Sequence, residues 1–283
     1  MTDWPQDYSA AWTLAAKTSR SGVGLHSGAE ATVELRPTDK PGFHMRLPEM
    51  EQPIQLRPDQ VRDSPLCTTL DLGSSKVSTV EHLLAALAGC GLSHVEIGLS
   101  GHEVPLLDGS ALGWVEAIAE ADLLEVPGWH PQRPELEHPL ALHRGSSVIT
   151  ATPAEQFSVV GVIDFPQPAI GRQQFTLELT PQRFVEEIAP ARTFGFRDQV
   201  EQLRAAGLIQ GGALDNALVC DGEHWLNPPL RFPDEPVRHK LLDLIGDLAL
   251  VGFPLAQVLV YRGSHGLHTD LAAALADRSP VQT

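Results

Sequence analysis

The sequence predicts an α+β protein of two similar domains, each a two-layer sandwich of a β-sheet packed on α-helices. Three observations predict this fold: a length of 283 residues, a repeated helix-strand unit, and strand-like segments that outnumber helical ones without regular alternation. A chain of this length suits two domains of roughly 100 to 150 residues each. The repeat indicates that the two domains arose by internal duplication.

A helix with a glycine stop, followed by a strand, occurs once in each half of the chain. The segments VEHLLAALAG (80–89) and VRHKLLDLIG (237–246) share Val, His, Leu, Leu and Gly at five offsets without a gap. Glycine commonly ends a helix, and the next segments, HVEIGL (94–99) and AQVLVYR (256–262), have strand-like composition. The sequence therefore predicts one such unit in each domain.

Further elements are predicted from composition and periodicity. Segments rich in Val, Ile, Thr or Phe and bounded by Pro or Gly predict strands at 31–37, 147–153, 157–165 and 174–179. Helices are predicted at 112–123, 181–188 and 197–206. The proline-rich stretch VPGWHPQRPELEHP (126–139) is typical of a linker. We therefore expect domains at 1–127 and 140–283, joined by a linker at 128–139.

Composition limits the location and the partners. A net charge of −16 would repel a phosphate backbone, so we expect no nucleic-acid binding, although a small anionic substrate stays compatible. No segment approaches the roughly 18 to 20 apolar residues of a transmembrane helix, and the N-terminus lacks a secretory signal pattern. We expect a cytoplasmic protein. Three separated cysteines without a CxxC pair predict neither disulfides nor a thiolate metal site: Cys67, Cys90 and Cys220.

The helix predicted in the second half carries the strongest sign of metal chemistry. His239 and Asp243 are four residues apart, so their side chains share one helical face. Asp247 extends that face by a turn, and Lys240 lies beside it. A solvated surface pair is the alternative interpretation, but the run LLDLIGDLALVGF (241–253) is too apolar for a face turned wholly to water. Carboxylates in such surroundings need a cation or a hydrogen-bond partner.

The first half supplies a third ligand and a base. Catalytic zinc usually takes three protein ligands of the His and carboxylate type and leaves one position for water. If the two equivalent helices face each other, His82 lies opposite His239. Glu81 directly precedes His82, and a carboxylate beside a ligand can act as the general base. The predicted ligands are therefore His82, His239 and Asp243, with Glu81 as the base.

Two other segments carry groups suited to chemistry. The run Arg192–Phe196 combines a guanidinium, a hydroxyl and aromatic rings, which suits anion or oxyanion contacts beside an apolar channel. A loop with a core phenylalanine pair is the alternative. His265 lies in RGSHGLH (262–268), read as a glycine-rich turn after the last strand, where a histidine can protonate a leaving group. A surface histidine is the alternative there.

Taken together and in order, six motifs resemble the UDP-3-O-acyl-N-acetylglucosamine deacetylase family of lipid A biosynthesis. The resemblance covers nearly the whole chain, and six ordered motifs are far more specific than any one of them. It implies two similar α+β domains with a zinc-dependent active site at their junction. The motifs are SGVGLHSG from Ser21, STVEHLLAALAG from Ser78, EVPLLDGSA from Glu103, ARTFGF from Ala191, LDNALV from Leu214 and VRHKLLDLIGDL from Val237.

The resemblance implies roles for individual residues. One zinc ion per chain, with iron(II) as an alternative, would be held by His82, His239 and Asp243, and Glu81 would activate water for attack on the acetamide carbonyl. Thr193 would help to stabilise the oxyanion. His265 would stabilise charge or protonate the departing amine. Either Glu81 alone carries out both proton transfers, or Glu81 and His265 share them.

Further residues would serve the substrate, a UDP-linked acylated amino sugar. Asp247 would hold His265 and raise its pKa, and Lys240 would meet substrate oxygens. An element inserted around 190–220 would form an apolar passage for the acyl chain. Phe194 would lie along the substrate path, with Val200, Leu214 and Val219 lining the passage and Leu25 near its mouth. We also expect a monomer.

The chain departs from the family pattern at two positions. Arg197 follows ARTFGF where the family often has an apolar side chain, which puts the passage wall in question. Ser264 precedes the final histidine where glycine is usual, which puts the turn geometry in question. The proline-rich segment LNPPLRFPDEPVRHK (226–240) resembles the cyanobacterial and plant branch more than the enterobacterial one. A bacterium of the Gram-negative type is the expected source.

Two competing interpretations remain at this point. One keeps the zinc but makes the protein an amidohydrolase of another N-acetylated sugar or amide. The other makes it a non-catalytic binding protein whose domains are joined by a structural metal. Structural zinc sites usually have four protein ligands, and three ligands with an adjacent carboxylate favour catalysis.

Overall fold

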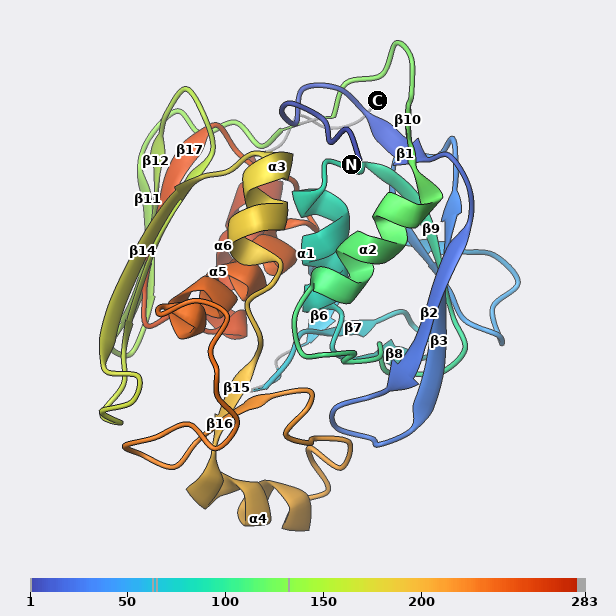
Figure 1. Ribbon diagram of the computed structural model, residues 1–283. Helices are drawn as coiled ribbons and strands as arrows, with labels where there is room; N and C mark the ends of the chain where they lie inside the picture. The colour runs from blue at the N-terminus through green and yellow to red at the C-terminus, as the bar shows by residue number, and fades with distance from the viewer. Residues whose placement is uncertain (1, 63, 65, 132, 279–283) are drawn as a thin grey trace.

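Two β-sheets form the outer layers of the protein, and the helices pack between them (Figure 1). The computed structural model describes residues 2–62, 64, 66–131 and 133–278. Layers of sheet, helices, helices and sheet are two α+β sandwiches packed helix against helix, as the sequence predicted. No helix in the described part of the chain is long and apolar enough to cross a membrane.

The first sheet is built by the N-terminal half of the chain. Seven strands form it in the described residues, and β9 pairs with β3 in antiparallel and with β4 in parallel orientation. The helices of this half are α1 (Glu81–Gly89) and α2 (Leu112–Ala121). The strands are β1 (Trp12–Leu14), β2 (Thr18–Val23), β3 (Glu30–Pro37), β4 (Gly42–Arg46), β5 (Ile54–Gln55), β9 (His94–Leu99) and β10 (Leu123–Glu125).

The second sheet repeats this plan with the C-terminal half. Among the described residues it has five strands in the order β11-β12-β17-β13-β14. Its central strand β17 follows α5 (Glu235–Leu248) and pairs with β12 in antiparallel and with β13 in parallel orientation. The strand after the repeated helix thus has equivalent neighbours in both sheets. The strands are β11 (Leu140–Arg144), β12 (Ser147–Pro153), β13 (Ser158–Asp164), β14 (Arg172–Glu178) and β17 (Ala256–Tyr261).

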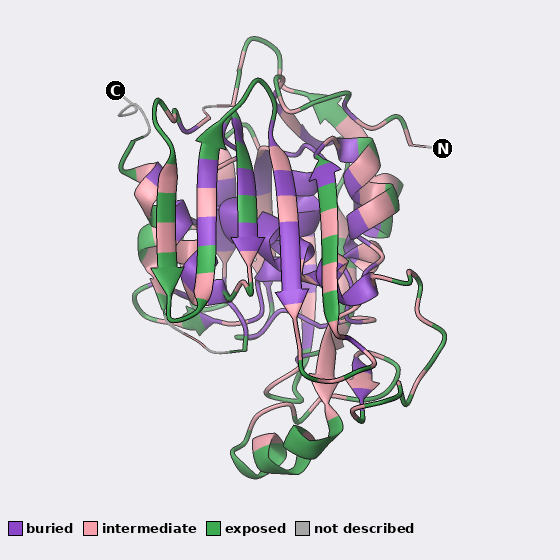
Figure 2. Cartoon of the chain, turned by 90° about the vertical axis from the view of Figure 1, so that its left-hand side faces the viewer, coloured by how far each residue is buried: buried purple, intermediate pink, exposed green. Residues whose placement is uncertain are grey.

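Alternation of side chains explains why each sheet buries one face. Along β17 every second residue is buried, from Ala256 to Val260, and Figure 2 shows such bands across this sheet. Most buried apolar residues of both halves then join in one continuous core, which includes Leu84 of α1 and Ile245 of α5, and a small second cluster contains Ile163 and Val237. The two sandwiches therefore share their interior along the helix layers.

The predicted elements agree with the structure at most positions. Each of the predicted strands and helices corresponds to an observed element, with ends that differ by a few residues. The segment predicted at 181–188 is one α-turn, α3 (Pro181–Arg183), continued by a π-helical turn, η2 (Phe184–Ile188). The predicted linker contains no strand or helix in its described residues and joins β10 to β11. We propose on this basis that the two domains span residues 1–127 and 140–283.

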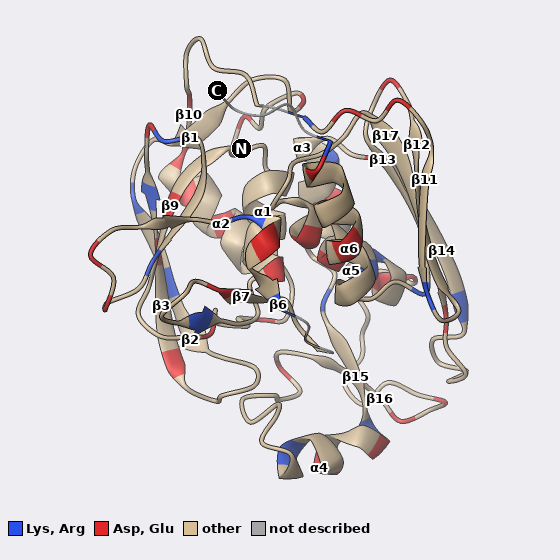
Figure 3. Cartoon of the chain, turned by 180° about the vertical axis from the view of Figure 1, so that it is seen from behind, with Lys and Arg blue, Asp and Glu red and all other residues tan. Residues whose placement is uncertain are grey.

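Smaller elements lie beside the two sandwiches. A parallel pair of short strands, β15 (Phe194–Phe196) and β16 (Leu218–Cys220), carries helix α4 (Arg197–Ala205) away from both sheets (Figure 1). No residue of α4 is buried, and the helix bears charges of both signs (Figure 3). A three-stranded sheet in the described residues joins β6 (Val61–Arg62), β7 (Thr69–Asp71) and β8 (Lys76–Val77).

Candidate metal centre and active site

The two repeated helices cross at close range where α5 meets the start of α1. A Cβ atom at Gly246 would overlap the carbonyl oxygen of Glu81, so only glycine allows this approach. The crossing brings Glu81 and His82 on α1 beside Asp243 and Asp247 on α5. Residues more than 150 positions apart thus form one buried polar group between two apolar sandwiches.

His82, His239 and Asp243 form a cluster with metal-ligand chemistry, which we call the ligand cluster. One ligand atom from each residue lies within 4.8 Å of the others, and all three residues are buried. Asp243 Oδ1 is 3.6 Å from His82 Nε2 and 3.4 Å from His239 Nε2. The two imidazole rings stand nearly perpendicular, with centroids 4.9 Å apart. This group can hold a metal ion.

The charge states of the cluster fit a cation. Burial lowers the pKa of His239 to about 3, so its ring is neutral and keeps a lone pair. Its Nδ1 donates to the Ala191 carbonyl at 3.0 Å, which leaves Nε2 free to bind a metal. Burial alone would raise the pKa of Asp243, but the Lys240 ammonium and His239 outweigh it and hold that pKa well below its usual range. The donor set is therefore the neutral imidazole of His239, the imidazole of His82 and the carboxylate of Asp243.

Lys240 contacts the cluster from the side. Its Nζ donates to Asp243 Oδ2 at 2.8 Å, while Oδ1 of the same carboxylate faces the two histidines. Burial alone would lower the pKa of Lys240, yet Asp243 raises it above its ordinary value. The ammonium therefore stays charged and fixes which oxygen of Asp243 faces the cluster.

Glu81 lies beside the ligand cluster and is held through Thr68, which sequence reasoning missed. The Thr68 amide donates to Glu81 Oε2 at 3.0 Å, and the Thr68 hydroxyl donates to Asp247 Oδ1. Burial raises the pKa of Glu81 above its ordinary value, although the histidines His265 and His82 act in the opposite direction. A carboxylate of raised pKa is better matched to general-base work near neutral pH.

His265 is buried, and the prediction that it lies in a glycine-rich turn was wrong. It begins helix α6 (His265–Ala276) and is 9% exposed, which also excludes the surface interpretation. Ser264 is the N-cap of this helix, since its hydroxyl accepts from the Leu267 amide. Ser264, which departs from the family pattern, therefore caps the start of a helix. A serine hydroxyl can do this, whereas glycine has no side chain to do so.

Asp247 and His265 form a buried pair that faces Glu81. His265 Nδ1 lies 3.0 Å from Asp247 Oδ2, and His265 Nε2 lies 3.9 Å from Glu81 Oε1 and 4.0 Å from Asp243 Oδ2. Burial alone would lower the pKa of His265, but Asp247, Asp243 and Glu81 outweigh it and raise the pKa to about 10. The ring is therefore an imidazolium at neutral pH, with Nε2–H directed at the base and the ligand cluster.

His268 is a second histidine on Asp247, and sequence reasoning missed it as well. Its Nδ1 lies 3.0 Å from Asp247 Oδ2, and the side chain is fully buried. His265 and His268 are three residues apart on α6, so the i, i+3 spacing would have signalled a shared face had the helix been recognised. Thr68 had no comparable signal, because its partners lie in segments distant from it in the sequence.

The segment from Ala191 to Phe194 connects the ligand cluster to the inserted strands. The Phe194 ring centroid lies 6.4 Å from that of His239, and the ring is half-buried among other aromatics. Thr193 is half-buried, its amide donates to Gly109 at 2.7 Å, and its carbonyl accepts from Leu218. Thr193 and Phe194 thus follow closely in the chain after Ala191, whose carbonyl orients His239.

The predicted passage residues lie on the inserted element or beside it. Leu25 lies beside it, since its carbonyl accepts from the Gly211 amide at 3.0 Å. Val219 is half-buried on β16, Val200 is half-buried on α4, and Leu214 is 54% exposed. Arg197, the second departure from the family pattern, is exposed and its guanidinium lies 4.0 Å from Asp221. It therefore points to a neighbouring carboxylate in the loop before α5.

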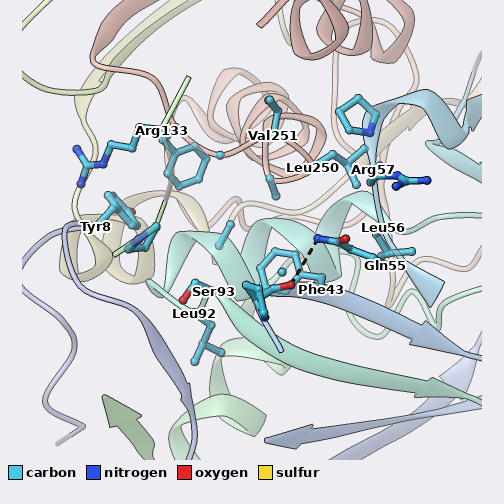
Figure 4. A pocket seen from close by; sticks show the side chains of 18 of the residues that line it. Tyr8, Phe43, Gln55, Leu56, Arg57, Leu92, Ser93, Arg133, Leu250 and Val251 are labelled. Atoms are coloured by element: carbon cyan, nitrogen blue, oxygen red, sulfur yellow. Dashed lines mark hydrogen bonds between the residues drawn. The ribbon is translucent and has the colours of Figure 1, made fainter. Parts of the chain in front are cut away.

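A cavity of about 410 Å³ lies at the opposite end of α1 from the ligand cluster. It is lined by both halves of the chain and the linker, with Phe43 and Val251 among its walls and Arg57 and Arg133 at its sides (Figure 4). It lies beside Ala88, near the end of the helix that Glu81 begins. The residues that line it include none of the predicted site residues, so it is separate from the active site.

Comparison with known proteins identifies the family. The model of the UDP-3-O-acyl N-acetylglycosamine deacetylase family matches residues 11–277. A UDP-3-O-acyl-N-acetylglucosamine deacetylase of Thermosynechococcus vestitus is 49% identical over 272 residues, covering 94% of each chain. One from Synechocystis is 46% identical over 271 residues, covering 94% of this chain and 98% of its own length.

A plant relative is also similar over most of the chain. The probable UDP-3-O-acyl-N-acetylglucosamine deacetylase 1, mitochondrial, of Arabidopsis thaliana is 40% identical over 287 residues, covering 93% of this chain and 87% of its own length. The chain belongs to the UDP-3-O-acyl N-acetylglycosamine deacetylase family.

Proposed function

We propose that this chain hydrolyses the acetamide of UDP-3-O-acyl-N-acetylglucosamine, giving UDP-3-O-acyl-glucosamine and acetate, the committed step of lipid A biosynthesis. The single observation that carries the proposal is the buried group of His82, His239 and Asp243 with Glu81 and His265 at its edge. Three metal ligands beside a base and an acid are what metal-assisted amide hydrolysis requires. The names of the relatives supply the substrate.

Zinc is the ion that we propose for the ligand cluster, at one per chain. Two imidazoles and one carboxylate are a common catalytic zinc set, and iron(II) binds the same donors. When bound, the divalent cation supplies a Lewis acid that acidifies water and polarises a carbonyl. The buried lone pair of His239 and the fixed Oδ1 of Asp243 support this use of the site.

The proton transfers follow from the positions of Glu81 and His265. Glu81 takes a proton from the attacking water as its oxygen adds to the acetamide carbon. The His265 imidazolium gives its Nε2 proton to the amine nitrogen as the carbon-nitrogen bond breaks. The two groups lie 3.9 Å apart, so the proton held by Glu81 can then restore His265. The proton that remains on the added hydroxyl passes to the amine, and acetate and the ammonium form of the product leave.

The remaining predicted residues have supporting roles. The Thr193 hydroxyl stabilises the oxyanion, and Asp247 keeps His265 charged and oriented. Lys240 orients Asp243 and meets substrate oxygens, while Phe194 lies along the substrate path. Leu25, Val200, Leu214 and Val219 border the acyl chain. The cytoplasmic location, the monomeric state and the Gram-negative-type source remain predictions from the sequence and the resemblance.

The assay compares substrates and one variant. Purified protein is expected to deacetylate UDP-3-O-acyl-N-acetylglucosamine and to leave simple N-acetyl sugars almost unchanged; comparable rates on both would refute the substrate assignment. Glu81→Ala is expected to lower kcat by about 10³-fold or more while zinc content stays near one per chain. Loss of the metal together with the fold in this variant would instead support a structural metal.

A further inference from the structure

Asp247 is held by three donors that come from two separate segments, Thr68 on one side and the start of helix α6 on the other. Its Oδ1 accepts from the Thr68 hydroxyl, and its Oδ2 lies 3.0 Å from the Nδ1 atoms of both His265 and His268. The carboxylate is fully buried, and the histidines hold its pKa below its ordinary value against the effect of burial. An ionised carboxylate only accepts, so each histidine carries its proton on Nδ1 toward it.

His268 and His265 both donate to Asp247, but they differ in charge and in their other contacts. Burial lowers the pKa of His268 below its ordinary value, so its ring is neutral, whereas His265 is charged. Its Nε2 is buried without a hydrogen-bond partner among the described residues. Among the residues that the structure describes, the bond to Asp247 is therefore the one hydrogen bond of the ring.

The chain makes room for this ring at a glycine. A Cβ atom at Gly263 would lie 2.5 Å from His268 Nε2 and 2.7 Å from Val260 Cγ2, closer than packing allows. Gly263 does not have the left-handed backbone that would demand glycine for another reason. It directly precedes Ser264, the N-cap of α6. The space for His268 and the start of the helix that presents His265 are thus adjacent.

We propose that His268 is a positioning residue for the deacetylation, acting through Asp247 to fix the imidazole of His265. Without His268, the Thr68 hydroxyl on Oδ1 and His265 on Oδ2 would each hold Asp247 through one bond; the second donor on Oδ2 adds a further restraint on rotation about the Cβ–Cγ bond. Because His265 and His268 share one face of α6, the same bonds also fix the start of that helix on α5. The Nε2–H of His265 then keeps its direction toward Glu81.

The test separates the hydrogen bond from packing with two substitutions. His268→Leu fills the space but removes the donor, whereas His268→Asn places its Nδ2 where the imidazole Nδ1 lies. This proposal rests on the proposed function for its kinetic readout. We expect His268→Leu to lower kcat about tenfold with KM changed less than twofold, and His268→Asn to recover most of that kcat. Equal activity of wild type and His268→Leu, or equal losses in both variants, would overturn the role.

A spectroscopic measurement keeps the outcome independent of the substrate. In the metal-free protein, the Nδ1–H proton of His265 is expected to give a protected low-field signal in wild type and His268→Asn that broadens or vanishes in His268→Leu. An unchanged signal in His268→Leu would contradict the proposal. A wild type that turns over no UDP-sugar would overturn the proposed function alone, since this signal still decides the role of His268.

A second variant guards against misfolding of the first. Gly263→Ala alters a half-buried position and pushes a methyl group against the His268 ring. It is expected to lower kcat and to weaken the same His265 signal, with the content of secondary structure and zinc unchanged. A Gly263→Ala protein with normal kcat and a normal His265 signal would show that the ring position does not matter.

Discussion

The repeated helices α1 and α5 carry the same histidine and differ at almost every other polar position. His82 and His239 occupy equivalent offsets and both face the ligand cluster. The third ligand, Asp243, has Ala86 as its counterpart on α1, while the base Glu81 has Arg238 as its counterpart on α5. The repeat thus accounts for the two imidazoles, and the differences between the copies account for the proposed third ligand on one side and the proposed base on the other.

The glycines at equivalent positions of the two helices show the same division, although Gly89 ends α1 whereas α5 continues past Gly246 to Leu248, contrary to the predicted glycine stop. Gly246 lets the backbone of α1 approach at Glu81, where the site forms, whereas Gly89 gives space to the Phe184 ring in the core. One copy of the glycine therefore serves the active site and the other serves packing. A shared sequence pattern predicts where a residue lies on its helix. The atoms that the residue contacts depend on which side of the junction between the two halves it faces.

Removing either histidine of the ligand cluster should have the largest effect and tests whether the two helices contribute equally. His82→Ala and His239→Ala are each expected to reduce zinc content to a small fraction per chain and to abolish turnover, because two remaining ligands hold zinc weakly. Elemental analysis and an acetate-release assay measure this, with the exposed His143→Ala as control. Retention of full zinc by either ligand variant would contradict an equal contribution of the two helices to the metal site.

Asp247→Asn tests the charge on the α5 side. An amide has one acceptor oxygen for three donors and no charge, so we expect kcat/KM to fall by about 10²-fold. The pKa of His265 should fall from about 10, because the carboxylate that raises it is gone. The alkaline limb of the pH profile then moves to lower pH, which a profile of kcat/KM for both proteins measures. If the alkaline limb stays at the same pH in Asp247→Asn, it reports the titration of a group other than His265.

Stability should depend on pH through the same pair. The folded-state pKa of His265 lies above its ordinary value of 6.5, so its stabilising effect is complete below that pH and is lost as pH rises through about 10. Urea unfolding of the metal-free protein between pH 7 and pH 10.5 is expected to show this loss, and Asp247→Asn should show less of it. Equal pH slopes in the two proteins would contradict the assignment.

Gly246→Ala tests the close approach of the helices. The added methyl group would overlap the backbone of Glu81, so α1 must move and the base moves with it. We expect kcat to fall by about ten- to a hundredfold and the free energy of unfolding to fall by about 1 to 3 kcal/mol. Gly101→Ala is the matched control, since its new Cβ would make only an ordinary contact at 3.5 Å with Ala31.

Arg238→Ala should have the smallest effect on catalysis, although this residue occupies the position equivalent to Glu81. Its guanidinium donates to Asp234 at 2.7 Å and to the Glu187 carbonyl at 2.9 Å, and it lies over the Phe175 ring. We expect a loss of about 2 kcal/mol in the free energy of unfolding with kcat within about threefold of wild type. A collapse of kcat at normal stability would show that this copy also serves the chemistry.

Sequence patterns were sufficient for the fold and for the ligand cluster. Period-two strands, the repeated helix and the i, i+4 spacing of His239 and Asp243 are local features, and the duplication supplied His82 across the junction. The placement of Glu81 beside the ligand cluster followed from its position next to His82, and its catalytic role stays a prediction. These placements were accessible because each depends on residues close together in the sequence or related by the repeat.

The environment of His265 was not predictable in the same way. Glycines at 263 and 266 favoured a turn over a helix, although the Ser264 cap and the apolar run that follows were signals for α6. Thr68 and His268 reach Asp247 from positions 179 and 21 residues away, and no local pattern links them. Packing of α6 on α5 decides these contacts, and packing is a property of the folded chain.

An anomalous difference map at the zinc edge, from crystals of the metal-loaded protein, tests most directly whether one ion joins the two halves. We expect a single strong peak between α1 and α5, about 2.0 to 2.2 Å from His82 Nε2, His239 Nε2 and an oxygen of Asp243. A map with no peak at this position, or a peak bound by residues of only one half, would contradict the shared metal centre.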